Sequence, residues 1–193
     1  SYYTSPFPKA AILTMDGSGD FVTCALSLGN GSRIKRLDSL YWPNSLGMLY
    51  FSVTQYLGFH EIGAEGKVMA LASFGRPRYV DEFRKILKVT PNGFKLDMSY
   101  FTFHLPVLID NWGDPTTAQF FIYRDWLSEK FHCLFGPARE PSAEVSQRHY
   151  DVAASLQQIL EEAVFSLLKK LHRLTGIDDV CLAGGVALNC VLN

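Results

Sequence analysis

The chain has 193 residues, of which 48% are hydrophobic and 19% are charged, and its formal net charge is −1. This composition is typical of a globular protein, and so small a net charge gives no reason to expect nucleic acid or an anionic membrane as a partner. No apolar run reaches the ~20 residues of a membrane span, and the polar, proline-containing N-terminus does not resemble a secretory signal. The four cysteines form no CxxC pair, which favours buried thiols in a cytoplasmic protein over a disulfide framework or a zinc site.

Three strands are predicted at the start of the chain. Residues 10–16, 21–29 and 32–42 are rich in β-formers, and the glycine-containing turns DGSGD and GNGS separate them. Asn-Gly in the second turn is a strong hairpin signal. We therefore predict an antiparallel meander.

Two helices are predicted next, over about 43–58 and 65–75, because apolar residues recur there at helical spacing. From about 76 to 142 the pattern loosens, with six prolines and scattered aromatic residues. We interpret this segment as an insertion that contains short helices.

The clearest helical pattern covers about 143–175, where a wide apolar stripe ends at Gly176, the predicted C-cap. The segment 178–189 follows with a short buried strand, two glycines and the expected start of another helix. A helix that begins in the last residues also predicts that the sequence is a piece of a longer protein.

The order of these elements predicts the fold class. Three antiparallel strands, a helix, and then a parallel strand reached through a helical crossover is the order of a ribonuclease H-like α/β domain. We therefore expect a mixed sheet, made of the meander and one parallel strand, with helices on its flanks.

The first candidate site is the junction MDGSGD. Gly17 and Gly19 lack a Cβ and tolerate positive φ, so the backbone N–H groups around Ser18 are placed to converge on a phosphate. Asp16, at the end of the strand, is placed to ligate a hard divalent cation held against that phosphate.

The second candidate site is the junction LAGGVALN. Gly184 and Gly185 would let a nucleotide approach the backbone, and the following helix would add its N-terminal N–H donors. Asn189 would offer its amide to a ribose or a base. Each junction alone is typical of a turn or of tight packing, and neither matches a Walker-type loop or GxGxxG. Because both end strands of one predicted sheet, together they predict a nucleotide cleft.

Five blocks of the sequence, in order, resemble the carbamoyltransferase family, which includes nodulation-factor and antibiotic O-carbamoyltransferases. The blocks are LTMDGSGD, SLGMLYFSVTQYLGF, EGKVMALASFG, FGPAREPSAEVSQRHYDVAASLQQILEE and CLAGGVALNCVLN. The likeness covers most of the chain and is weakest around 88–121.

The resemblance implies an actin-like domain of the sugar-kinase superfamily. This chain would be mostly its second lobe, truncated at both ends and inactive alone. In the parent enzyme a YrdC-like domain would make carbamoyl-adenylate from carbamoyl phosphate and ATP. The actin-like domain would transfer the carbamoyl group to a hydroxyl of a small-molecule acceptor, using a divalent metal, usually iron.

Site residues follow from the resemblance position by position. Asp16 matches a metal-ligating aspartate, and Glu65 and Lys67 match a motif that faces the cleft, for which we expect a catalytic role. The expected nucleotide contacts are Gly17, Ser18, Gly19, Gly184, Gly185 and Asn189. The family's metal-binding HxxxH pair and a further metal-binding aspartate are expected in parts of the parent chain outside this sequence.

Other conspicuous residues have two interpretations each. His149 is predicted to pack against or cap the long helix rather than to act in catalysis. Arg139 would either neutralise a carbamoyl or phosphate group or form a surface ion pair. Trp112, Phe120 and Phe121 would line an acceptor pocket or form a small core of the insertion.

Two other classes of function remain open. A phosphotransferase of the same superfamily would use the glycine turns to hold ATP, and a non-catalytic nucleotide-binding domain would keep the fold alone. An HxxxH pair upstream would favour carbamoyl transfer, and its absence a kinase.

Overall fold

The structure is a computed structural model, and it describes residues 1–61, 63–105 and 124–193. Trp112, Phe120 and Phe121 lie outside the described residues, so both interpretations of these side chains stay predictions.

The chain divides into two compact units. The first unit comprises Ser1–Leu49, Leu87–Leu96 and Gln158–Asn193, and the second comprises Tyr50–Ile86 and Asp97–Gln157. All the residues of the two glycine junctions belong to the first unit.

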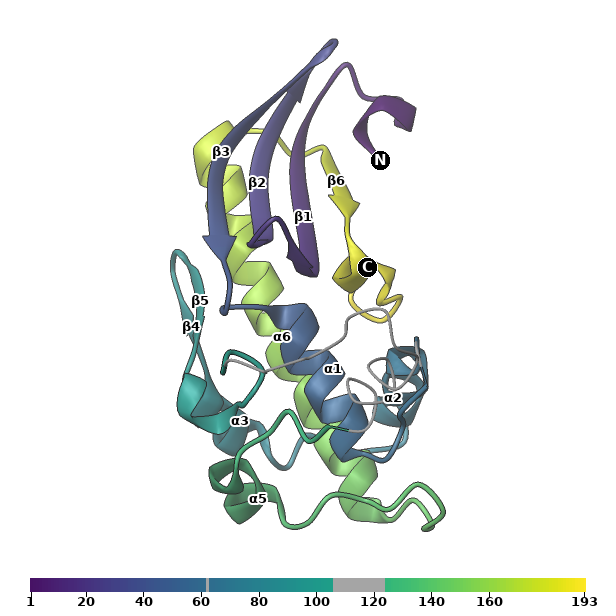
Figure 1. The fold of residues 1–193 in the computed structure, drawn as a ribbon. Coiled ribbons are helices and arrows are strands. Elements are labelled where there is room, and N and C mark those ends of the chain that lie inside the picture. The colour runs from purple at the N-terminus through teal and green to yellow at the C-terminus, as the bar shows by residue number, and fades with distance from the viewer. Residues whose placement is uncertain (62, 106–123) are drawn as a thin grey trace, which may run out of the picture. The chain divides into compact units, whose positions relative to one another are not determined.

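The first unit contains a four-stranded sheet of strand order β3-β2-β1-β6. Strands β1 (Lys9–Gly19), β2 (Val22–Asn30) and β3 (Arg33–Tyr41) are antiparallel neighbours, and β6 (Val180–Ala183) pairs with β1 in parallel (Figure 1). The predicted mixed sheet, a meander plus one parallel strand, is confirmed.

The turn between β1 and β2 differs from the prediction. Strand β1 continues through DGSG to Gly19, and the two-residue loop is Asp20 and Phe21, with φ of 49° and 64°. Positive φ at both central residues is the requirement of a type I′ hairpin. The glycines form a bulge instead, because Met15 pairs with Cys24 and Gly19 with Val22, leaving residues 16–18 opposite one residue of β2. The predicted turn at GNGS is confirmed, since Asn30 pairs with Arg33 across a two-residue loop.

Five α-helices lie in the described residues: α1 (Leu46–Tyr56), α2 (Glu65–Ala72), α3 (Val80–Ile86), α5 (Glu129–Phe135) and α6 (Gln147–Thr175). Single 3-10 turns occur at η1 (Tyr2–Thr4), η2 (Met98–Tyr100) and η3 (Gly185–Leu188). The predicted apolar stripe of α6 is largely buried from Val152 to Leu171, whereas Leu174 at its end is exposed. Gly176 (φ 63°) donates its N–H to His172 O at 2.7 Å, which confirms the predicted C-cap. None of the helices in the described part of the chain has both the length and the apolar character that a bilayer span needs.

A hairpin that the sequence did not predict lies inside the proposed insertion. Strands β4 (Leu87–Thr90) and β5 (Gly93–Leu96) are four residues each, and they belong to the first unit. Gly93 has φ of 128°, and a Cβ there would lie 3.0 Å from a methyl group of Leu167 on α6. The hairpin therefore packs closely on the long helix.

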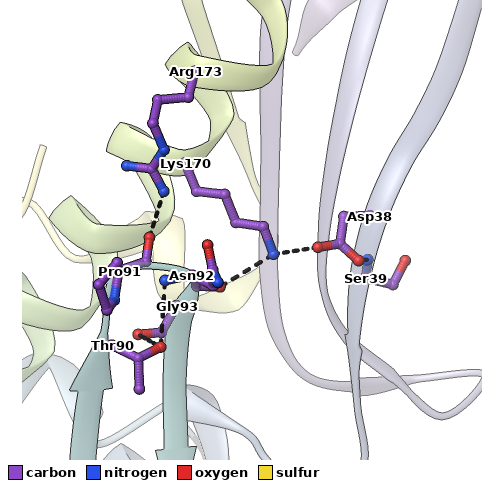
Figure 2. Close-up of polar contacts among 8 residues, drawn as sticks. All are labelled: Asp38, Ser39, Thr90, Pro91, Asn92, Gly93, Lys170 and Arg173. Atoms are coloured by element: carbon purple, nitrogen blue, oxygen red, sulfur yellow. Dashed lines mark hydrogen bonds and ion pairs between the residues drawn. The ribbon is translucent and has the colours of Figure 1, made fainter.

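Polar contacts fasten the hairpin turn to α6 and β3 (Figure 2). The Lys170 ammonium donates to Asn92 O at 3.1 Å and pairs with the Asp38 carboxylate. The Arg173 guanidinium donates to Pro91 O at 2.5 Å. The hydrogen bond from Lys170 holds the pKa of Asp38 below its usual value. One lysine thus links a helix, a strand and a hairpin of the first unit.

Candidate functional site

The bulge Asp16–Ser18 forms one side of the candidate site. Asp16 and Ser18 are exposed, although Met15 immediately before them is buried. The N–H of Gly17 donates to Asp16 Oδ1 at 2.8 Å. The bulge therefore presents a carboxylate and flexible backbone at the end of a core strand.

The loop after β6 forms the other side. Because Thr14 pairs with Ala183 in the parallel register, Gly184 comes next to Met15. A Cβ on Gly184 (φ 91°) would lie 2.1 Å from Met15 O, and one on Gly185 would lie 3.2 Å from Asp16 Oδ1. Only glycine fits the first position. The prediction that the two junctions lie side by side at one end of the sheet is confirmed.

The chain after these glycines differs from the prediction. Instead of an α-helix, the structure has the four-residue turn η3, and the expectation of a helix N-terminus is wrong for the described residues. Asn189 ends the turn, and its Oδ1 accepts the N–H groups of Val191 and Leu192 at 3.1 and 3.0 Å. The amide oxygen therefore serves the local turn. A contact of Asn189 with a ribose or a base stays a prediction.

Asp16 does not complete a metal site together with other described residues. No group of three or more His, Cys, Asp or Glu side chains there is arranged to hold a metal ion. One carboxylate is too small a ligand set for a transition metal. We therefore assign no chemical step to a metal, and the role of Asp16 as a ligand stays a prediction.

Glu65 and Lys67 belong to the second unit, in the first turn of α2. Lys67 is exposed, and its Nζ lies 2.9 Å from Glu61 Oε1 and 5.6 Å from the centre of the Phe59 ring. The hydrogen bond from Lys67 lowers the pKa of Glu61. Residues two apart on a helix do not share a face, so Glu65 and Lys67 do not form a pair. Their catalytic role stays a prediction.

Arg139 is a buried structural residue, and neither predicted role describes its contacts. Its side chain donates from Nε to Leu57 O at 2.6 Å, from Nη2 to Gly58 O at 3.3 Å, and from Nη1 to Pro141 O at 3.1 Å. The residue is 7% exposed, so the surface ion pair is wrong. Its donors hold two loops of the second unit together.

His149 caps the start of α6, as predicted. Its Nδ1 accepts the N–H of Ser146 at 2.9 Å, the reciprocal bond of a capping box. Burial, and after it the charges of Arg148 and Arg139, lowers the pKa of His149. The ring therefore accepts this bond in its neutral form.

Two residues of the site were missed. Ser45, at the start of α1, donates its hydroxyl to Gly17 O at 2.7 Å. A Cβ on Gly47 would lie 2.6 Å from Gly17 N, so α1 packs directly on the bulge. Ser45 lies in the predicted helix over about 43–58, but the sequence carried no signal that this helix would meet a strand end 28 residues earlier.

Comparisons with known proteins agree with the resemblance. The family model described as Carbamoyltransferase N-terminus matches residues 1–193. The chain is 37% identical to the uncharacterized protein sll1178 of Synechocystis sp., 35% to nodulation protein NolNO of Sinorhizobium fredii and 33% to nodulation protein NolO of Bradyrhizobium diazoefficiens. Each match covers 100% of this chain but only 29%, 25% and 30% of the respective relative.

Proposed function

Since this chain belongs to the carbamoyltransferase family, whose N-terminal model spans all of its residues, we propose that it supplies the nucleotide side of a carbamoyl-transfer site. The donor in this proposal is carbamoyl-adenylate, made from carbamoyl phosphate and ATP, and the acceptor is a hydroxyl of a small molecule. A sugar, an aminoglycoside and a modified oligosaccharide are each compatible acceptors.

The observation that carries the proposal is the meeting of the bulge with the glycine loop after β6. Gly185 lies so close to the Asp16 carboxylate that an added Cβ would be 3.2 Å from Oδ1. Side-chain-free backbone on two adjacent strand ends is what a phosphate needs in order to reach N–H donors. Strand ends are also where ligands bind in open α/β sheets.

In the proposed reaction the acceptor oxygen bonds to the carbamoyl carbon, and the bond from that carbon to the adenylate phosphate oxygen breaks. AMP leaves, and the hydroxyl proton passes to solvent or to a base. The backbone N–H groups of residues 17–19 would hold the phosphate of AMP as negative charge develops on it. The exposed Asp16 carboxylate would repel that phosphate unless a cation lay between them.

Several parts of the proposal lie outside the described residues. A divalent metal, iron in the first instance, would offset the repulsion between the Asp16 carboxylate and the phosphate. The other ligands of this metal would come from other parts of a longer chain. A YrdC-like domain would supply the adenylate. The three relatives are each more than three times as long as this chain, which leaves room for such parts.

The test is a pair of transfer assays on the full-length protein with a panel of sugar acceptors. With labelled carbamoyl phosphate and ATP, the proposal predicts a carbamoylated acceptor and one AMP for each transfer. With γ-labelled ATP alone, it predicts no phosphorylated acceptor. The reverse pattern would make the protein a phosphotransferase, and binding of ATP without either transfer would leave a non-catalytic nucleotide-binding domain.

A further inference from the structure

We infer that Ser45 is a positioning residue that turns the backbone N–H groups of Gly17 and Ser18 toward the bound ligand. The identity of the ligand, a nucleotide phosphate, rests on the proposed function. The geometry of Ser45 does not depend on the proposed function.

Ser45 is completely buried, and its hydroxyl makes contacts of two kinds. Oγ lies 2.7 Å from Gly17 O and 3.1 Å from Asp16 O, so its one hydrogen is shared between two carbonyl groups of the bulge. Oγ also accepts the N–H of Met48 at 3.0 Å, which is the N-cap bond of α1. A single hydroxyl therefore joins the helix start to the bulge.

The direction of the bulge amides follows from peptide geometry. In a trans peptide the C=O and N–H groups point in opposite directions, and Trp42–Pro43 is the one cis bond among the described residues. Because Asp16 O and Gly17 O face Ser45, the N–H groups of Gly17 and Ser18 point away from Ser45. The bond from Gly17 N–H to Asp16 Oδ1 agrees, since that carboxylate lies next to Gly185. The Gly17 amide thus faces the side where the glycine loop lies, and the Ser18 amide points away from Ser45.

The segment that carries Ser45 is itself held from two strands. The backbone oxygen of Asn44 accepts the Thr23 hydroxyl of β2 at 2.5 Å, and Asn44 Oδ1 accepts the N–H of Leu96 on β5 at 3.0 Å. On the far side, Gly47 lets α1 rest on the peptide between Asp16 and Gly17. Ser45 is therefore a fixed point against which the bulge is oriented.

The test uses three substitutions at this position in the full-length protein. Ser45→Ala removes both the donor and the helix cap. Ser45→Asp keeps an acceptor for Met48 N–H but has no hydrogen for the two carbonyl groups. Ser45→Thr keeps both functions. Ser166→Ala is the matched control, because Ser166 is a buried serine on α6 that donates to Thr90 O, away from the bulge.

The measurements are calorimetric affinity for AMP, hydrogen exchange of a peptide over residues 13–22, and thermal unfolding. Losing the hydrogen bonds from Ser45 to the bulge should weaken AMP binding by about tenfold in Ser45→Ala and Ser45→Asp, with faster exchange in the 13–22 peptide. Ser45→Thr should restore both values. Ser166→Ala should lower the melting temperature while leaving AMP affinity and that exchange as in the wild type.

Equal AMP affinity in Ser45→Asp and the wild type would overturn the inference, as would unchanged exchange of the 13–22 peptide. If the wild-type protein binds no AMP, the proposed function fails instead. The exchange measurement then still decides the role of Ser45. If Ser45→Ala does not fold, the Ser45→Asp variant, which keeps the helix cap, is compared with the wild type instead.

Discussion

Replacing Gly47 by Ala should destabilise the protein, although the same change stabilises most helices. Gly47 is the second residue of α1, and Gly66 is the second residue of α2. Alanine is favoured over glycine in a helix by up to about 1 kcal/mol, and that gain is common to both sites. The two positions therefore form a matched pair in which only the surroundings differ.

The surroundings set the sign of each effect. A Cβ on Gly47 would lie 2.6 Å from Gly17 N and 2.8 Å from the carbonyl carbon of Asp16, whereas a Cβ on Gly66 meets nothing within 4 Å. Backbone cannot swing aside as a side chain can, so the helix and the bulge must separate, and overpacking of this kind costs about 1–3 kcal/mol. We expect a net loss of about 1–2 kcal/mol for Gly47→Ala and a gain of up to about 1 kcal/mol for Gly66→Ala.

Urea denaturation followed by circular dichroism measures both changes, and an unchanged m-value would show that the same surface unfolds. Gly47→Ala should also weaken AMP binding, because the bulge has to move. If Gly47→Ala stabilises the protein as much as Gly66→Ala does, then α1 does not rest on the bulge, and the assignment of Ser45 fails with it.

Three further changes test the rest of the structure. Lys170→Met should lower the free energy of unfolding by about 1–2 kcal/mol at neutral pH. A double-mutant cycle with Asp38→Asn should assign at most about 1 kcal/mol of this loss to the ion pair, whose Asp38 side chain is 40% exposed. That coupling should disappear in acid. Because the pKa of Asp38 is lower in the folded than in the unfolded protein, its stabilisation is fully present above the unfolded pKa, near 3.9, and is lost as the pH falls through the folded pKa. The wild-type protein should lose stability between about pH 8 and 5.5. The pKa of His149 is lowered in the folded protein, so below about pH 6.5 the unfolded protein binds more protons at this residue than the folded protein does. His149→Gln should reduce this loss. Arg139→Lys should lower the free energy of unfolding by about 2–4 kcal/mol in chemical denaturation, because one ammonium group cannot reach the carbonyl groups of two loops. A loss as small as that of a substitution at an exposed arginine would contradict the structural role of Arg139.

The sheet and the long helix were predictable because their signals are local. Runs of β-formers divided by Asn-Gly specify the meander, and the apolar stripe with Gly176 at its end specifies α6. The nearness of the two glycine junctions followed from topology alone, since parallel neighbours end at one edge of a sheet.

The parts that were missed depend on contacts between distant residues. DGSG has the composition of a turn, but the chain turns later, at Asp20 and Phe21, where a bulky residue takes a positive φ that no local preference predicts. The hairpin of β4 and β5 has strands too short for a pattern, and it is held by Lys170, 78 residues from Asn92. The bond from the Ser45 hydroxyl to Gly17 O likewise joins residues 28 apart in the sequence.

In the proposed function, the bulge and the glycine loop after β6 form the nucleotide side of a carbamoyl-transfer site. The most direct measurement compares Asp16→Asn with Asp20→Asn in the full-length protein, assayed for ATP-dependent carbamoylation of an acceptor. Both carboxylates are exposed and four residues apart, and Asn is well suited to the positive φ of Asp20, so neither change should alter stability by more than about 0.5 kcal/mol. We predict that Asp16→Asn loses at least about 100-fold in rate, because Asn would no longer hold the proposed cation that offsets transition-state charge, and that Asp20→Asn keeps wild-type activity. Wild-type activity in Asp16→Asn, or an equal loss in both variants, would contradict the placement of the transfer site at the bulge.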